Sequence, residues 1–364
     1  MPHTVMPVQV GAAAPWLPDV LPTDPDDALA AARTWPAHLR PGGGATAGLW
    51  SLLATLAVHD LGVARAVEPH LDALAIREQA GLADGADRTW GVFAAEGPGV
   101  RLDAVPRGPG SGASGTRPGG DVPDDGTSDD AAPPDDPPAW RLTGTKPWCS
   151  LADRLDAALV TAHLPDGGRA LFAVDLTDPG VTLVDQPWVS RGLAEIPSTP
   201  VAFDAVPAAP VGGPGWYLER PGFWWGGIGV AACWYGGAVG LGRVLWERAT
   251  TTDDRLVAMH LGAVDAALED ARRALDEAAR VVDGDLDPAV PGPVVAKRVR
   301  ATVARTCEDV LARAGHALGP APLALDAGHA KRVADLQVYV RQQHAERDDA
   351  SLGDALARRD VAPW

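Results

Sequence analysis

The segment RLTGTKPWCSLADRLDAALVTA, residues Arg141–Ala162, decides the fold. It is typical of a strand, a tight turn, a short polar loop and a second, buried strand over Ala157–Ala162. Gly144 stands at a turn position, where a positive φ costs a glycine little. Trp148 and Ser150 follow, and an indole beside a hydroxyl suits a planar heterocycle, because the indole packs on the ring and the hydroxyl bonds a ring nitrogen. The alternative is a core Trp with a Ser that caps the turn, and the local pattern alone favours that alternative.

The same segment resembles the flavin-contact segment in the middle domain of the acyl-CoA dehydrogenase family. The matching positions are Leu142, Gly144, Lys146, Trp148, Cys149 and Ser150. In that family the Trp flanks the isoalloxazine ring and a Thr or Ser hydroxyl faces flavin N5, so the resemblance implies these roles for Trp148 and Ser150. It also implies FAD as cofactor, α,β-dehydrogenation of a small-molecule substrate such as an acyl-CoA thioester, and a homodimer or homotetramer.

Further cofactor contacts follow from the resemblance. The strand expected over Trp90–Ala95 corresponds to a family segment that contacts the flavin, with Ala95 in place of a Thr. Arg101 falls where the family has a Ser that helps to hold the thioester, and Arg313 is the candidate ligand for the cofactor phosphate. The predicted cofactor-binding residues are therefore Trp148, Cys149, Ser150, Ala94, Ala95 and Arg313.

Composition and charge limit the class of protein. The chain has 364 residues, of which 46% are hydrophobic, so it can bury a sizeable core. Its net charge of −17 opposes nucleic acid or an anionic membrane as a partner, because phosphates are repelled. Three widely spaced cysteines give neither a disulfide framework nor a zinc-ligand spacing, so we expect no metal. With no signal peptide at the N-terminus, we expect a cytoplasmic protein.

The patterning predicts a mainly α chain with a middle β domain. Residues 1–85 form an N-terminal helical domain, residues 86–214 a β domain of antiparallel or barrel type, and residues 215–364 a helical domain. The last is a C-terminal four-helix bundle in the resembled fold, with its final helix expected over Ala330–Ala357. Residues 106–139 are low in complexity and rich in Pro, Gly and Asp, which predicts a disordered insertion.

A run of charged residues accompanies the apolar stripe of the N-terminal helices. Asp60, Arg65, Glu68 and His70 give a pattern that is similar to the N-terminal domain of the same family. We interpret it as a solvated helix face with a satisfied His rather than a catalytic group.

The uncharged run Gly222–Gly242 is long enough to span a membrane. Its many glycines, and the amphipathic helices that follow and need a partner, instead favour a buried core helix.

The catalytic base of the resembled family is missing. Family dehydrogenases use a Glu from the late helix or from the apolar helix, but Gln343 occupies the first position and Gly222–Gly242 has no carboxylate. Glu346 can substitute only if the register slips, and His344 stands where a Gly is usual. The candidate catalytic residues are therefore His344, Gln343 and Glu346.

Two alternatives to the dehydrogenase stay open. A flavin-dependent monooxygenase of the same fold would place His344 and Ser150 at the reactive edge of the flavin, although a solvent-facing His is favoured by its charged neighbours. A catalytically degraded binding protein would explain the empty base positions.

Overall fold

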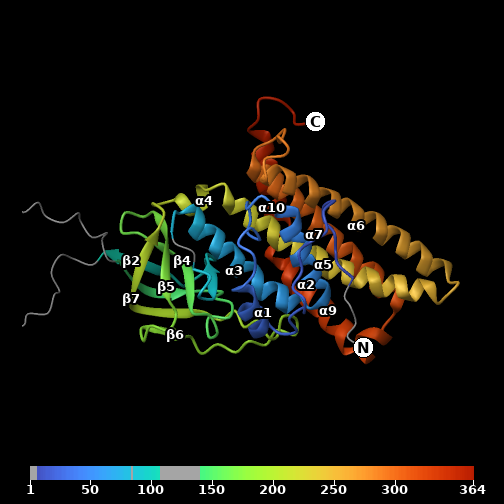
Figure 1. Ribbon diagram of the computed structural model, residues 1–364, viewed down its shortest axis with the longest axis horizontal. Coiled ribbons are helices and arrows are strands. Elements are labelled where there is room, and N and C mark those ends of the chain that lie inside the picture. The colour runs from blue at the N-terminus through green and yellow to red at the C-terminus, as the bar shows by residue number, and fades with distance from the viewer. Residues whose placement is uncertain (1–5, 83–84, 107–139) are drawn as a thin grey trace, which may run out of the picture.

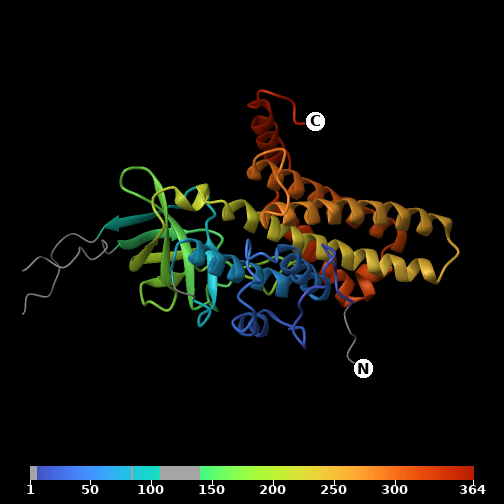
Figure 2. The ribbon, with the colours of Figure 1, turned by 45° about the horizontal axis from the view of Figure 1, so that its top comes forward.

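The computed structural model describes residues 6–82, 85–106 and 140–364. The predicted insertion, apart from Pro106, lies outside the described residues. Figures 1 and 2 show an elongated molecule with the strands gathered at one end and the long C-terminal helices extending to the other. The N-terminal helices lie between these two layers, so all three predicted parts of the chain meet near the centre.

Three helices form the N-terminal part: α1 (Pro25–Ala32), α2 (Thr46–His59) and α3 (Leu61–Gln79). A single residue, Asp60, separates α2 from α3, and its carboxylate caps α3 by accepting hydrogen bonds from the backbone N–H groups of Gly62 and Val63. Almost every residue of α2 is buried, because α2 packs against both α3 and the C-terminal helix α5. The helical periodicity expected over residues 46–82 is confirmed.

Within the described residues, the β domain has seven strands: β1 (Trp90–Phe93), β2 (Leu102–Pro106), β3 (Trp140–Lys146), β4 (Ala157–His163), β5 (Arg169–Asp175), β6 (Val181–Leu183) and β7 (Val201–Val211). The pairings β4–β2–β3–β7–β5 return to β4, so the sheet curls into a ring. One residue pair, Asp103 with His163, closes that ring between β2 and β4, which gives the predicted barrel only weak support.

The two ends of the antiparallel pair of β2 and β3 differ in structure. Its outermost residues, Pro106 and Trp140, lie opposite each other. At the inner end Gly144 has a φ of 122°, and a Cβ there would lie 2.2 Å from the carbonyl oxygen of Arg101. Only glycine fits at this position. The tight turn expected at Gly144 is wrong, because the residue lies inside β3, where the pairing with β7 shifts register between Leu142 and Gly144.

Three long helices dominate the C-terminal part: α5 (Gly222–Thr250), α6 (Arg255–Val282) and α7 (Gly292–Leu318), with the short α4 (Trp216–Glu219) before them and α8 (Ala321–Leu325) after them. The chain then forms α9 (Ala327–Tyr339), the 3₁₀ turn η1 (Val340–Gln342) and α10 (Glu346–Ala357). The continuous last helix expected over Ala330–Ala357 is wrong, since η1 and a positive φ of 47° at Ala345 interrupt it. The four-helix bundle is not confirmed, because α9 has less than half the length of the other three.

Helix α5 is the apolar run Gly222–Gly242, extended to Thr250 by about two turns. It is long and apolar enough to cross a membrane, but 78% of its most apolar window is buried inside the protein. A Cβ at Gly236 would lie 2.2 Å from the backbone oxygen of Ala54 on α2, so the two helices approach closely at a glycine. These contacts support the interpretation of α5 as a core helix.

Candidate active-site cavity

A cavity of about 910 Å³ lies where the three parts of the chain meet. This volume falls in the range of pockets that hold cofactors and small ligands. Helix α3 lines it with Arg65, Glu68, Pro69 and Asp72, which we call the α3 wall. The opposite lining, the β wall, consists of Ala94, Ala95, Trp148, Ser150 and Ser198. The connection between β6 and β7 and the end of α9 complete the enclosure.

A strained backbone conformation places the side chain of Trp148 at the cavity. Trp148 and Leu151 have φ values of 60° and 57°, in a region that L-residues rarely adopt. The loop is fixed by backbone hydrogen bonds from Cys149 N–H to the Thr199 oxygen, at 3.2 Å, and from Leu151 N–H to the Pro197 oxygen, at 2.9 Å. The Trp148 side chain is left 59% exposed while its neighbours are buried. A flat apolar face at the rim of a cavity suits a planar ligand.

A chain of hydrogen bonds crosses the cavity at Ser150. The Arg65 guanidinium on α3 donates to the Ser150 hydroxyl at 2.9 Å, and the hydroxyls of Ser150 and Ser198 lie 2.7 Å apart. Ser198 in turn donates to the Ile196 carbonyl at 3.3 Å. Arg65 thus places a positive charge beside the hydroxyl that the resemblance assigns to the flavin edge.

The α3 wall carries two buried carboxyl groups. Glu68 is 8% exposed, and burial, with the neighbouring Asp72, raises the pKa of Glu68 to about 8 against the opposing effect of Arg65 and Arg300. Burial also raises the pKa of Asp72, although the Arg220 guanidinium lies 3.7 Å away. Between them Pro69 has no N–H to donate to the Arg65 carbonyl one turn earlier, which loosens the helix along this wall.

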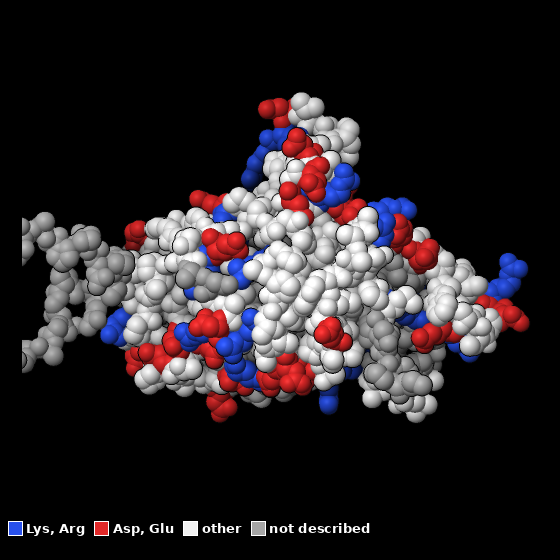
Figure 3. All heavy atoms as spheres, viewed as in Figure 1, with Lys and Arg blue, Asp and Glu red and all other residues white. Residues whose placement is uncertain are grey.

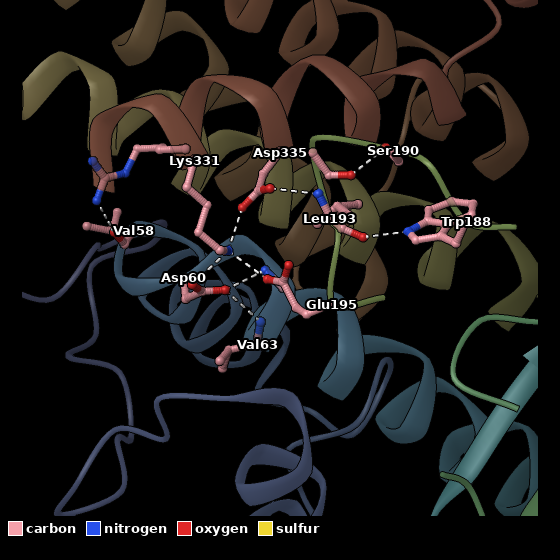
Figure 4. Close-up of polar contacts among 12 residues, drawn as sticks. Val58, Asp60, Val63, Trp188, Ser190, Leu193, Glu195, Lys331 and Asp335 are labelled. Carbon is pink, nitrogen blue, oxygen red and sulfur yellow. Dashed lines mark hydrogen bonds and ion pairs between the residues drawn. The ribbon is translucent and has the colours of Figure 1, made fainter. Parts of the chain in front are cut away.

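Outside the cavity, a cluster of ionic contacts supports the side that is formed by the β6–β7 connection and α9. Figure 4 shows the residues of this cluster. The Lys331 ammonium of α9 lies 2.9 Å from Asp60, 2.6 Å from Glu195 and 2.7 Å from Asp335; we call these four residues the Lys331 cluster. Burial acts to lower the pKa of Lys331, but its hydrogen bonds to the three carboxylates outweigh burial and raise it. The three carboxylates are close enough to hold a metal ion, but the ammonium occupies the position among them.

The Lys331 cluster is joined directly to the cavity lining. Asp335 accepts a hydrogen bond from the backbone N–H of Leu193 at 2.6 Å, and the Leu193 carbonyl accepts one from the Trp188 indole at 3.1 Å. Trp188 and Leu193 both line the cavity. The cluster therefore fixes the β6–β7 connection against α3 and α9.

The structure brings some of the predicted site residues together. Ala94, Ala95, Trp148, Ser150 and His344 line the cavity. The His344 side chain is 64% exposed and lies 3.5 Å from Asp348, in keeping with the favoured solvent-facing interpretation.

The other predicted site residues do not line the cavity. Cys149 is fully buried behind the loop, where burial raises the pKa of its thiol to about 12. The Gln343 side chain accepts a hydrogen bond from the Ala345 backbone, and Glu346 begins α10. Arg313 pairs with Asp309 on α7, at 2.6 Å. Their predicted roles as ligands or catalytic groups stay predictions.

The interpretation of the charged residues on α3 was wrong in part. Glu68 and His70 are buried rather than solvated, and Arg65 and Glu68 line the cavity. His70 is satisfied at one ring nitrogen, because His70 Nδ1 accepts a hydrogen bond from the Trp90 backbone at 3.3 Å. The available signal was the spacing of Arg65, Glu68 and Asp72 by three and four residues, which places all three on one helix face.

Charge on the visible surface is mixed. On the face drawn in Figure 3, acidic and basic side chains of the described residues are interspersed along the lower edge. This distribution differs from the continuous basic stripe that binds a phosphate backbone.

The cavity fits the ring system of a flavin. Its volume, the exposed indole of Trp148 and the hydroxyl pair of Ser150 and Ser198 supply space, a stacking surface and hydrogen-bonding groups. Buried polar atoms around it, among them Tyr339 Oη and Asp72 Oδ1, have no hydrogen-bond partner within the described parts of the chain. Such atoms favour a polar ligand.

Comparison with known proteins places the fold. No family model and no curated protein matches the chain. Among solved structures, butyryl-CoA dehydrogenase from Megasphaera elsdenii is 16% identical, with 86% of this chain and 82% of that chain covered and a TM-score of 0.69. TdsC from a Paenibacillus species, in complex with FMN and indole, is 17% identical, covers 86% and 84%, and has a TM-score of 0.67. A nitrososynthase from Micromonospora carbonacea is 18% identical, covers 92% and 88%, and has a TM-score of 0.67.

Each of these likenesses covers more than four fifths of this chain and of the compared chain. Together with the three-part architecture, they establish that this protein has the acyl-CoA dehydrogenase fold.

Proposed function

We propose that this protein is a flavin-dependent oxidoreductase that acts on a small molecule held in the cavity. The observation that carries the proposal is the β wall, where an exposed indole and a hydroxyl pair line one side of a cavity of about 910 Å³. TdsC, one of the structures of this fold, is recorded with FMN, and butyryl-CoA dehydrogenase carries an oxidoreductase name. The sequence resemblance implies FAD, so both flavins are candidates.

The described residues have separate tasks in this proposal. Trp148 packs on the flavin ring, and Ser150, held by Ser198, offers its hydroxyl to a ring nitrogen. Arg65 stabilises negative charge at that edge, because its guanidinium already donates to the Ser150 hydroxyl. The backbone of Ala94 and Ala95 supplies contacts at the end of β1. When bound, the flavin supplies the electron-accepting centre, and the protein supplies orientation and charge.

The first reaction to test is the α,β-dehydrogenation of an acyl thioester such as an acyl-CoA. That reaction needs a base for the α-proton, and neither the Gly222–Gly242 part of α5 nor the side chain of Gln343 offers one; Glu247, near the end of α5, does not line the cavity.

Monooxygenation is the second candidate, favoured by a specific observation. His344 and Ser150 both line the cavity, which is the pair that this alternative requires. A degraded binding protein is the outcome if no flavin binds.

Absorption spectroscopy of the purified protein with added FAD or FMN tests the proposal. Flavin binding with a shifted visible spectrum is expected, and Trp148→Ala should weaken it about tenfold, because base-type stacking on an aromatic ring contributes about 1–3 kcal/mol. Trp246→Ala is the matched control, since Trp246 is 58% exposed, against 59% for Trp148, and does not line the cavity. A protein that binds neither flavin, or that responds equally to both substitutions, would refute the proposed site.

A panel of acyl-CoA thioesters, added without oxygen, then separates the two reactions. Bleaching of the flavin by one thioester supports dehydrogenation. Product that forms only with a supplied reductant and oxygen supports monooxygenation. Light scattering of the loaded protein tests the expected homodimer or homotetramer.

A further inference from the structure

We infer that Glu68 is the group that exchanges a proton with the substrate, and that the part of the substrate beside it is uncharged and carries a dissociable hydrogen. The inference rests on the proposed function and adds the acid–base group and the substrate class to it. In the step, the bond between hydrogen and a substrate atom breaks, its electron pair stays on the substrate, and the proton bonds to a carboxylate oxygen of Glu68.

The position of Glu68 is the first support. It projects from α3 into the cavity lining and is only 8% exposed. Within the described residues no hydrogen bond or ion pair reaches its carboxylate, whereas the third carboxyl of the lining, Glu96, is bonded to Lys146 at 2.8 Å. A buried carboxyl that faces a cavity without a protein partner is available to a ligand.

The neighbouring charges are the second support, because they are already engaged. Arg65 donates to Ser150, and Arg300 donates to the carbonyl oxygens of Gly227 and Gln342. The titratable and charged groups that act on Glu68 or are acted on by it are Arg65 and Asp72 of α3, Tyr217 of α4, Cys233 of α5, Arg300 of α7 and Tyr339 of α9. With its pKa near 8, Glu68 can both accept and return a proton close to neutral pH.

Polar atoms without partners surround the same place. Tyr339 Oη, Asp72 Oδ1 and Trp50 Nε1 lack hydrogen-bond partners among the described residues. A Cβ at Gly229 of α5 would lie in ordinary contact with both Trp50 Nε1, at 3.7 Å, and Glu68 Oε1, at 4.0 Å, which places these two atoms on the same side of α5. The Trp50 indole and the Tyr339 hydroxyl are neutral groups that suit an uncharged polar group of the substrate, because an unpaired charge is costly to desolvate.

Infrared spectroscopy of the unloaded, full-length protein tests the inference without any flavin. A protonated-carboxyl stretch should titrate with a midpoint near pH 8 and should be missing from Glu68→Gln. Glu78→Gln is the matched control: the same change on the same helix, at a side chain that is 67% exposed. Glu68→Asp, which keeps a carboxyl, should retain a titrating band even if the Gln variant folds poorly. Identical spectra of the wild-type protein and Glu68→Gln would overturn the inference.

A nitrophenol is a probe for the proton transfer itself, because its phenolate absorbs visible light. The wild-type protein should generate bound phenolate, and Glu68→Gln should generate at least about tenfold less, as expected for loss of a hydrogen bond to a charged group. Wild-type protein that yields no more phenolate than the variant would overturn the inference.

The two proposals fail separately. Flavin binding with an ionised, non-titrating Glu68 would refute the inference and leave the proposed function standing. A titrating Glu68 in a protein that binds no flavin would refute the proposed function and leave the protonation behaviour inferred for Glu68 standing.

Discussion

Asp60, the N-cap of helix α3, and Glu68, within that helix, are acidic residues whose surroundings are opposite. Asp60 caps the helix and lies 2.9 Å from the Lys331 ammonium, in a cluster that joins α3, the β6–β7 connection and α9. Glu68, two turns later, lies in the cavity wall with no ion pair among the described residues. The comparison shows that the start of one helix can join parts of a protein through ion pairs, while the middle of the same helix places an unpaired carboxyl group in the wall of a cavity.

The same contrast holds for the two groups of charges as wholes. In the Lys331 cluster one ammonium contacts three carboxylates within 2.9 Å. At the α3 wall the closest opposite charges among the described residues are those of Asp72 and of Arg220, which lies outside the wall. Their side chains are 3.7 Å apart. Paired charges stabilise the assembly, whereas charges held apart keep the capacity to change their protonation state.

Removal of the Glu68 carboxyl is expected to have the largest effect. Glu68→Gln should lower kcat/KM of the proposed reaction by about 10²- to 10⁴-fold, which is the usual contribution of a positioned acid–base group. Stopped-flow measurement of flavin reduction by an accepted acyl-CoA checks it. If the Gln variant turns over as fast as the wild-type protein, the contrast between the two ends of α3 has no catalytic meaning.

Loss of the Lys331 ammonium should affect stability instead. Lys331→Met leaves three carboxylates without their cation, one of them the almost fully buried Asp335, so the free energy of unfolding should fall by about 3 kcal/mol. Urea unfolding measures it. Lys297→Met is the control, since among the described residues the Lys297 ammonium bonds only to the carbonyl and hydroxyl oxygens of Ser351, and its loss should cost about 1.5 kcal/mol. Equal losses in the two variants would mean that the three carboxylates bind the ammonium no more strongly than two neutral oxygens do.

The pH dependence of stability should separate Glu68 from the paired carboxylates. Its pKa is raised from 4.5 to about 8 on folding, so the folded protein holds a proton that the unfolded chain releases above pH 4.5. The contribution of Glu68 to the free energy of unfolding is fully present below pH 4.5. It falls by about 1.4 kcal/mol per pH unit between pH 4.5 and about pH 8. Because the other titrating groups are common to both proteins, the difference in stability between the wild type and Glu68→Gln, measured by unfolding at several pH values, should change with that slope; parallel curves would contradict it.

The smallest effect is expected in the β wall, where the contact is between neutral groups. Ser198→Ala removes the hydroxyl 2.7 Å from Ser150 and should reduce stability by about 1 kcal/mol. Thermal unfolding of this variant, compared with Thr177→Ala at an exposed turn, provides the measurement. A loss as large as that of Lys331→Met would erase the distinction between ionic and neutral contacts.

The sequence predicted the β wall better than the α3 wall, because of a resemblance carried by one short segment. The local pattern around Trp148 and Ser150 alone favoured a core Trp and a capping Ser, and the resemblance of Leu142–Ser150 to a known family segment indicated their place at the cavity. The surroundings of Glu68 come from α5, α7 and α9, more than a hundred residues away, and a charged helix face looks the same in sequence whether water or protein covers it.

The helical part shows the same limit. Periodicity correctly indicated α5, α6 and α7, because each long stripe repeats many times. The interruption at η1 has no glycine or proline to announce it, and it follows from burial of Tyr339 and Val340 against the rest of the chain. Burial of α5 was predicted from its glycines, and the approach to Ala54 shows why they are needed.

The pairing of Pro106 with Trp140 has a consequence for engineering. The two residues lie opposite each other at the far end of β3, whose other end is Lys146, shortly before Trp148, so about 20 Å of strand separate the pair from the cavity wall. The entropy of closing a loop grows only with the logarithm of its length, so the β2–β3 ladder tolerates sequence of very different lengths between its ends. This connection is therefore the place to graft a reporter or a second module while the cavity stays intact.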